Sequence, residues 1–185
     1  MDTGDKGERQ LLSRLRRSDE RAWVQFLAEH RDRIYRFCIR MVRNHHAAED
    51  LTQDVFKRAV EFIDTYRGEA SLRTWLYSIA RNQCITYLTG RSAGRQSDLD
   101  ETWFADLTDD NPDPERLSAS QELSLALESA LGELDQAFRE VILLREIEGL
   151  TYEDIAQVTG VPPNTVKTRI HRARAQLQQR LARFR

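Results

Sequence analysis

The chain has 185 residues, of which 40% are hydrophobic and 31% are charged, and its formal net charge is −2. This composition is typical of a globular, helix-rich protein with one domain or two small ones. No apolar run approaches the roughly 18 residues that span a bilayer. The polar N-terminus, MDTGDKGERQ, lacks the apolar segment of a signal peptide. We therefore expect a cytoplasmic protein.

Charge is distributed unevenly along the chain. Residues 1–90 carry a net charge of +3 and residues 91–118 carry −5, while all seven charged residues after Asp154 are cations. Local charge marks interaction surfaces. The acidic middle segment and the basic C-terminal segment are therefore expected to meet different partners.

The first 90 residues predict four amphipathic helices, because their apolar residues recur at steps of three and four. The first helix covers residues 11–17, and Ser18 is the expected cap of the second. The third helix runs from about residue 47 to 66, and the fourth follows Gly68 with Ser71 as its cap. No segment alternates with period two, so these helices predict an all-α domain.

Periodicity is lost after Gly90, where the chain becomes polar, acidic and interrupted by two prolines. An irregular stretch of this length is unusual inside a compact domain. We therefore expect two small helical domains, residues 1–90 and 119–185, joined by a flexible acidic linker at residues 91–118. Three apolar linker residues are expected to dock on a domain or on a partner: Trp103, Phe104 and Leu107.

The C-terminal domain is predicted to contain two helices and then a helix-turn-helix. Asp135 is the expected cap of the second helix, which closes at Gly149. The first helix is defined by four leucines: Leu123, Leu127, Leu131 and Leu134.

The helix-turn-helix lies between Thr151 and Leu181 and is the clearest local signal. Thr151 is expected to cap its first helix, with Asp154 three residues later as a near match to a capping box. Gly160 ends that helix where a positive φ costs little, and the prolines at 162 and 163 start the next one. An apolar stripe follows along the second helix: Val166, Ile170, Ala173, Leu177 and Leu181.

The opposite face of this second helix is basic, which indicates a DNA-reading helix. Helix geometry places four side chains near base edges: Lys167, Thr168, His171 and Arg172. Four others lie better for contacts with the DNA backbone: Asn164, Thr165, Arg169 and Arg174. The alternative is a solvated basic face on a structural helix hairpin.

Residues 50–88 hold two further polar features. One helix places Asp50, Gln53, Asp54 and Lys57 on an outer face, a pattern that by itself indicates only solvent exposure. The next segment can stack on unpaired bases and follow a phosphate backbone, because it mixes aromatic and cationic side chains, although Trp75 alone is more typical of a core. The segment contains Tyr66, Arg67, Arg73, Trp75, Tyr77, Arg81 and Asn82.

Three stretches carry a family resemblance: DLTQDVF at 50–56, YRGEASLRTWLYSIARN at 66–82 and LREIEGLTYEDIAQVTGVPPNTVKTRIHRAR at 144–174. They resemble, in order, a bacterial sigma factor of RNA polymerase of the extracytoplasmic-function (ECF, group IV) type. The resemblance covers both expected domains and the acidic linker between them. It implies a dissociable polymerase subunit that directs promoter-specific initiation, with no catalysis, cofactor or metal of its own.

The resemblance also implies roles for particular residues. Core polymerase, through the β′ clamp coiled coil, would be bound by Asp50, Gln53, Asp54 and Phe56. A flipped base of the melted −10 element would be captured by Tyr66, Arg67, Gly68 and Ser71, with Arg73, Trp75 and Asn82 on the next helix. The −35 element would be read by the helix from Asn164 to Arg174, although Asn164 stands where relatives often have Gly. The β flap of polymerase and an anti-sigma factor are the other implied partners.

Three other interpretations fit parts of the sequence. A LuxR-type regulator has a similar helix-turn-helix, but residues 1–90 show no strands of a receiver or ligand domain. A decoy that only binds polymerase would not need a basic reading helix. A metal-dependent enzyme could use His45, His46, Glu49 and Asp50, although a ligand pair at i and i+4 is missing.

The two cysteines lie within apolar helical patterns. Cys38 and Cys84 are therefore expected to be buried free thiols rather than a redox or metal site.

Overall fold

The computed structural model describes residues 3–92 and 114–182, and every regular element in these ranges is helical. Across the same ranges, no helix has both the length and the apolarity needed to cross a bilayer. A 3₁₀ turn at Ile63–Thr65 follows α3, and a π-helical turn at Leu143–Ile147 follows α6. The α-helices are α1 (Thr3–Arg16), α2 (Glu20–Val42), α3 (His45–Phe62), α4 (Leu72–Ser92), α5 (Pro114–Gly132), α6 (Gln136–Ile142), α7 (Tyr152–Thr159) and α8 (Pro163–Arg180).

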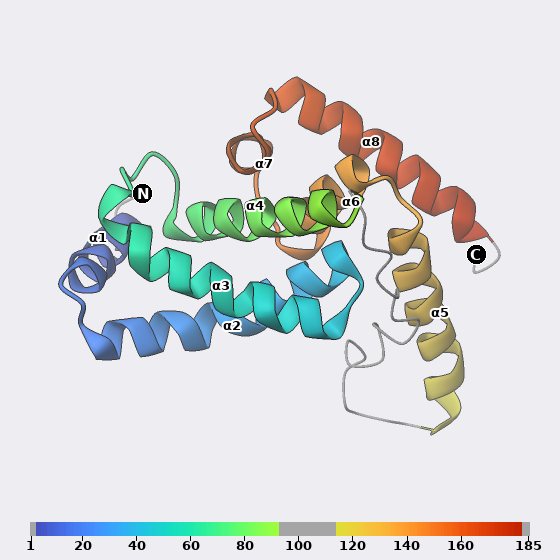
Figure 1. Cartoon of the computed structure of the whole chain (residues 1–185). Coiled ribbons are helices and arrows are strands. Elements are labelled where there is room, and N and C mark those ends of the chain that lie inside the picture. Colours follow the sequence, from blue (N-terminus) through green and yellow to red (C-terminus); the bar gives the residue numbers. More distant parts are fainter. Residues whose placement is uncertain (1–2, 93–113, 183–185) are drawn as a thin grey trace.

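The N-terminal half is a bundle of α2, α3 and α4, with α1 against the start of α2 (Figure 1). Aromatic rings fill its centre, where Phe37 and Tyr77 meet edge to face with centroids 5.5 Å apart. The indole Nε1 of Trp23 donates to the carbonyl of Leu15 at 3.1 Å and ties α1 to α2. Cys38 on α2 and Cys84 on α4 are both buried free thiols, as predicted.

Three helix starts in the N-terminal half differ from the sequence-based expectation. Helix α1 begins at Thr3, about eight residues earlier than expected. Asp19, not Ser18, caps α2, because its carboxylate accepts from the backbone N–H of Ala22 while Ser18 takes a φ of 56° in the preceding turn. A hydrogen bond from Arg14 holds the pKa of Asp19 below its ordinary value. Asn44 caps α3 at the N–H of Ala47, so this helix begins about two residues earlier than expected. Asn44 and Asp19 are both standard cap residues.

The C-terminal half is built around α6 and α8, with the short α7 between them along the chain. Thr151 and Asp154 form the predicted capping box of α7, and Gly160 ends that helix with a φ of 72°. The prediction that Asp135 caps α6 is confirmed only in position. Asp135 occupies the cap position, but its side chain makes no capping hydrogen bond there.

The two halves pack directly against each other. Helix α4 lies across the middle of the molecule, with α2 and α3 on one side and α7 on the other (Figure 1). A single apolar cluster runs from Leu15 in α1 to Ala173 in α8. The expected two small helical domains therefore share an interface. Helix α4 continues to Ser92 and α5 starts at Pro114, both inside the range expected for the linker, and Trp103, Phe104 and Leu107 fall outside the described residues.

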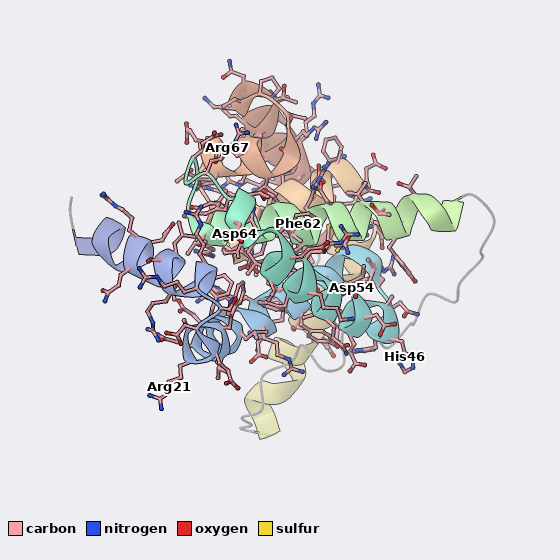
Figure 2. The ribbon with its side chains drawn as sticks, turned by 60° about the vertical axis from the view of Figure 1, so that its left-hand side comes forward. Arg21, His46, Asp54, Phe62, Asp64 and Arg67 are labelled. Carbon is pink, nitrogen blue, oxygen red and sulfur yellow. The ribbon has the colours of Figure 1, made fainter. Side chains whose placement is uncertain are left out.

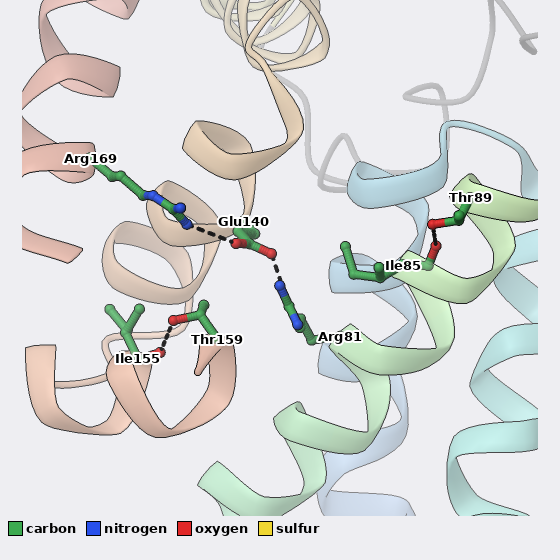
Figure 3. A network of polar contacts seen from close by, with 7 residues as sticks. All are labelled: Arg81, Ile85, Thr89, Glu140, Ile155, Thr159 and Arg169. Carbon is green, nitrogen blue, oxygen red and sulfur yellow. Dashed lines mark hydrogen bonds and ion pairs between the residues drawn. The ribbon is translucent and has the colours of Figure 1, made fainter. Parts of the chain in front are cut away.

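Buried carboxylates of the C-terminal half meet arginines of the N-terminal half across this interface. Glu140, 2% exposed, accepts from Arg81 Nε at 3.0 Å and faces Arg169 Nη1 of α8 at 3.5 Å (Figure 3). Glu128 pairs with Arg40 at 2.7 Å, with only 8% and 11% of the two side chains exposed. Charges this far from water are tolerated because they are paired.

Arg139 joins the halves in a different way. Its guanidinium donates to Met41 O at the end of α2 and to three carbonyls near the end of α5, those of Leu131, Gly132 and Leu134. The last carbonyls of a helix lack partners within the helix and carry partial negative charge. One cation therefore caps two helix ends at once. Burial, together with nearby Arg43, lowers the pKa of Arg139 to about 10.

Replacing Glu140 by Gln keeps the size of the side chain but removes the charge that two arginines share. We expect the free energy of unfolding to fall by about 1–3 kcal/mol, because one buried charged acceptor is lost. Partial hydration of Arg81 and Arg169 limits this loss. Urea unfolding followed by circular dichroism measures this change. The control Glu61→Gln, on the exposed end of α3, should change stability by less than about 0.5 kcal/mol. An equal effect of both substitutions would contradict the role assigned to Glu140.

Candidate nucleic-acid and polymerase interfaces

Helix α8 presents the face that the sequence predicts for DNA reading. Its apolar stripe is anchored by Val166, Ile170 and Ala173, each at most 1% exposed, which fixes the rotation of the helix on α6. The opposite side is open to solvent. The exposed predicted readers are Asn164, Thr165, Lys167, Thr168, His171, Arg172 and Arg174.

The cations of α8 differ in their partners. Arg169 is half-buried and faces Glu140 in the interface between the halves. Arg174 donates to Glu146 at 2.6 Å, and this hydrogen bond raises the pKa of Arg174. Lys167 and Arg172 are exposed and form no ion pair within the described part of the chain. They are therefore the cations best placed to meet DNA.

Three of the predicted −10 residues, Tyr66, Arg67 and Trp75, line a pocket at the start of α4. Its walls include the rings of Tyr66 and Trp75, whose centroids lie 5.3 Å apart at an interplanar angle of 48°. Gly68 takes a φ of 77° in the loop before the helix, a conformation that a side chain would strain. The pocket measures about 380 Å³ and is lined by Thr65, Tyr66, Arg67, Glu69, Ala70, Trp75, Ser78 and Gln157.

Gln157 comes from the other half of the molecule and was not predicted. Gln157 lies on α7, and its Nε2 donates to the carbonyl of Glu69 at 3.5 Å. The C-terminal half therefore reaches the rim of the pocket. No local pattern distinguishes this glutamine from other exposed polar residues of a helix. Its position follows only from the packing of α7 on α4.

Helix α4 places its predicted −10 residues on different rows. Trp75 and Asn82 lie on one row with Ser78, which was not predicted, at steps of three and four, and Asn82 is exposed. Arg73 lies on a different row and donates to the carbonyl of Glu148 in the C-terminal half. Ser71 accepts from the backbone N–H of Thr74 at 3.0 Å, which confirms it as a cap of α4. Arg73 is thus the one member of this predicted set that the structure engages across the domain interface.

The predicted polymerase face lies on the outside of α3. Asp50 and Gln53 are exposed, and Asp54 stands on the outer side of the helix with its carboxylate 3.0 Å from Lys57 Nζ (Figure 2). Phe56 differs from its three companions, because its side chain is only 6% exposed and belongs to the core. Phe56 therefore does not share the exposed face with Asp50, Gln53 and Asp54, and it packs beneath that face instead.

An apolar groove between α5, α6 and α8 was also not predicted. Leu123 and Leu127 are 45% and 39% exposed, although they share a helical spacing with the buried Leu131. With Leu125 also 39% exposed, the leucines of α5 exceed what one buried helix face can hold, and that excess was a usable signal. The groove is lined by Leu123, Leu127, Ile142, Glu146, Arg174, Leu177, Gln178 and Leu181.

The two histidines considered for a metal site, His45 and His46, lie at the start of α3. His45 Nδ1 shares a hydrogen bond of 2.9 Å with the hydroxyl of Tyr35, and His46 is exposed at the start of α3 (Figure 2). In residues 3–92 and 114–182, no three His, Cys, Asp or Glu side chains are grouped so that they could hold a metal ion.

Known proteins match both halves of the chain. The family model for Sigma-70 region 2 matches residues 26–94, and that for Sigma-70 region 4 matches residues 124–177. The ECF RNA polymerase sigma factor SigW of Bacillus subtilis is 33% identical, over 92% of this chain and 94% of its own. The RNA polymerase sigma-H factor of Pseudomonas aeruginosa is also 33% identical, over 94% and 93%.

Another relative is longer. The ECF RNA polymerase sigma factor SigE of Mycolicibacterium smegmatis is 36% identical over 87% of this chain, which spans 62% of that relative.

Two solved structures share the fold. One is the sigma factor RpoE in complex with the anti-sigma factor NepR from Bartonella quintana, with a TM-score of 0.67, 29% identity and coverage of 85% of this chain and 95% of that one. The other is CnrH in complex with the cytosolic domain of CnrY, with a TM-score of 0.70, 27% identity and coverage of 95% and 97%. Because relatives one-third identical align over more than nine-tenths of both chains, and region 2 and region 4 fall on its two halves, the chain belongs to the ECF family of RNA polymerase sigma factors, which direct promoter-specific transcription initiation.

Proposed function

We propose that this sigma factor reads the −35 element with α8 and captures an unpaired base of the −10 element in the pocket beside Trp75. The observation that carries the proposal is that pocket, which two aromatic rings and the polar side chains of Arg67 and Ser78 surround. A base that is flipped out of a duplex needs stacking partners and hydrogen-bonding groups to its edge, and this pocket offers both.

The −35 reading rests on the exposed cations of α8. A helix fits the major groove, where arginine and lysine contact guanine edges and phosphates. Lys167 and Arg172 are unpaired within the described residues and stand on one open face with His171. Arg169 and Arg174 are drawn toward Glu140 and Glu146 and are better suited to contacts at the edge of the groove.

We place two polymerase contacts on this chain. The polar outer face of α3, Asp50, Gln53 and Asp54, would meet the β′ clamp coiled coil, and Phe56 would support it from the core. The apolar groove beside Leu123 and Leu127 would meet the β flap. The groove suits a partner with its own apolar helix face, because exposed leucines of this kind gain free energy when they are covered.

An anti-sigma factor is the third proposed partner. The two solved neighbours are complexes of sigma factors with anti-sigma factors, and this chain matches each of them over both halves. That likeness supports the proposal that the packed arrangement, with α7 against α4, is the form an anti-sigma factor would bind. The protein would supply recognition without chemistry of its own, and it would act in the cytoplasm, where polymerase meets the chromosome.

Arg172→Ala should weaken binding of the holoenzyme to a duplex carrying the −35 element by roughly 10- to 100-fold, the equivalent of ~1–3 kcal/mol for one base contact. Affinity for a −10 strand should stay unchanged. Fluorescence anisotropy with labelled duplex measures both. Arg180→Ala, which removes the same charge from the far end of α8, is the matched control, since Arg180 pairs with Glu133 at the surface. Equal losses in both variants would show a general charge effect and refute base reading by Arg172.

The double substitution Asp50→Ala with Gln53→Ala should weaken binding to core polymerase without unfolding α3, because both side chains face solvent. Competition with labelled wild-type protein for core enzyme gives the affinity, and circular dichroism checks the fold. Glu61→Ala on the same helix serves as the control. Unchanged competition by the double variant would remove the polymerase contact from this face.

A further inference from the structure

The loop that lines the base pocket is held from behind by α1. We infer that α1 positions this loop, residues 66–71, for base capture through the carboxylate of Glu8 and the guanidinium of Arg16. The inference rests on the proposed capture of a −10 base beside Trp75. It adds a pair of positioning residues that lie outside the pocket, in a helix for which no sequence pattern indicated a function.

Glu8 acts as a distant cap for α4. Its Oε1 accepts from the backbone N–H of Leu72, the first residue of that helix, at 2.8 Å and across 64 residues of chain. The first N–H groups of a helix have no partner within the helix, and a carboxylate there is further favoured by the helix dipole. The local cap, Ser71, serves Thr74 instead. The start of α4, and with it the end of the loop, is therefore fixed from two directions.

Tyr66, at the beginning of the loop, is held at both of its ends. Its backbone carbonyl accepts from Arg16 Nη2, about two helical turns after Glu8 in α1. Its hydroxyl donates to the carbonyl of Ala70 and lies 3.3 Å from Glu8 Oε1. Tyr66 as a whole is 6% exposed. Burial first, and then the charge of Glu8, raise the pKa of Tyr66 to about 12.

These contacts decide the shape of the pocket. The ring of Tyr66 packs beside Trp75, and both line the cavity, so a shift of Tyr66 would change the wall against which a base stacks. Arg67, Gly68 and Glu69 are exposed, and Arg67 and Glu69 belong to the lining of the pocket. A loop that is fixed on its inner side loses less conformational freedom when it takes up a base, and binding is tighter as a result.

Helix α1 has a separate anchor, which makes the inference testable. Leu15 is 1% exposed in the core, and its carbonyl accepts from Trp23 Nε1. Removal of the Glu8 carboxylate therefore leaves α1 attached to α2 while its contacts to the loop are lost.

The test compares Glu8→Ala, Glu8→Gln and a control, Glu29→Ala, which removes a carboxylate from the exposed face of α2. Each variant is assembled with core polymerase. Two labelled probes are used: a promoter fork whose −10 strand is unpaired, and a duplex that carries only the −35 element. We expect Glu8→Ala to weaken fork binding by about five- to tenfold, the loss of one charged acceptor, and to leave duplex binding unchanged. Glu8→Gln keeps an acceptor oxygen and should recover most of the affinity.

A spectroscopic measurement separates positioning from a general structural role. Titration of ¹³C-labelled tyrosine by NMR, with Tyr66→Phe to assign the signal, should give a lower pKa for Tyr66 in Glu8→Ala than in the wild type. Fork binding at the wild-type level, an unchanged pKa of Tyr66, or equal losses on fork and duplex would each overturn the inference. Trp75→Ala tests the proposed function separately: if it binds the fork as well as the wild type, base capture in this pocket is wrong, whatever Glu8 does.

Discussion

Helix α4 must serve three surfaces at once, and the rest of the structure is arranged around it. Because successive residues of a helix are turned by about 100°, its side chains fall into three neighbouring rows. Leu72, Leu76, Ala80 and Cys84 enter the core, each at most 3% exposed. Arg73, Tyr77 and Arg81 face the C-terminal half. Trp75, Ser78 and Asn82 lie along the proposed −10 surface. A change in the rotation of α4 would disturb all three surfaces together.

The row of Arg73, Tyr77 and Arg81 explains why the two small domains pack together. Glu148 accepts from both Arg73 and Tyr77, and Glu140 accepts from Arg81. Burial, followed by the charge of Glu148, raises the pKa of Tyr77, so its hydroxyl stays a donor. Buried carboxylates are stable here only while their partners are present. The interface thus requires one particular geometry. Its polar groups would be hydrated again if the halves separated, so the free energy of separation would be lower than for a purely apolar interface of similar area.

Local features were predictable from sequence, and long-range ones were not. The capping box at Thr151, the turn at Gly160 and the stripe from Val166 to Ala173 depend on residues a few positions apart, so α8 and its buried face were predicted correctly. Of the residues that line the pocket beside Trp75, the family resemblance indicated only Tyr66, Arg67 and Trp75 as −10 residues. The supports of the pocket, Glu8 and Gln157, are joined to it only by tertiary packing. Leu123 and Leu127 have a regular apolar spacing, but helical spacing does not reveal whether the facing surface belongs to this chain or to another.

Arg73 illustrates how the packed form and promoter binding are related on the proposed function. The sequence pattern places it among the −10 residues, while the structure pairs it with Glu148 of the C-terminal half. Both a carboxylate and a DNA phosphate are anions that a guanidinium binds by charge-assisted hydrogen bonds. On the proposed function, a promoter that parts the halves would let Arg73 exchange the Glu148 carboxylate for a DNA phosphate, which would offset part of the free energy lost at the interface. The same arginine would then stabilise the packed form without making its opening prohibitively costly.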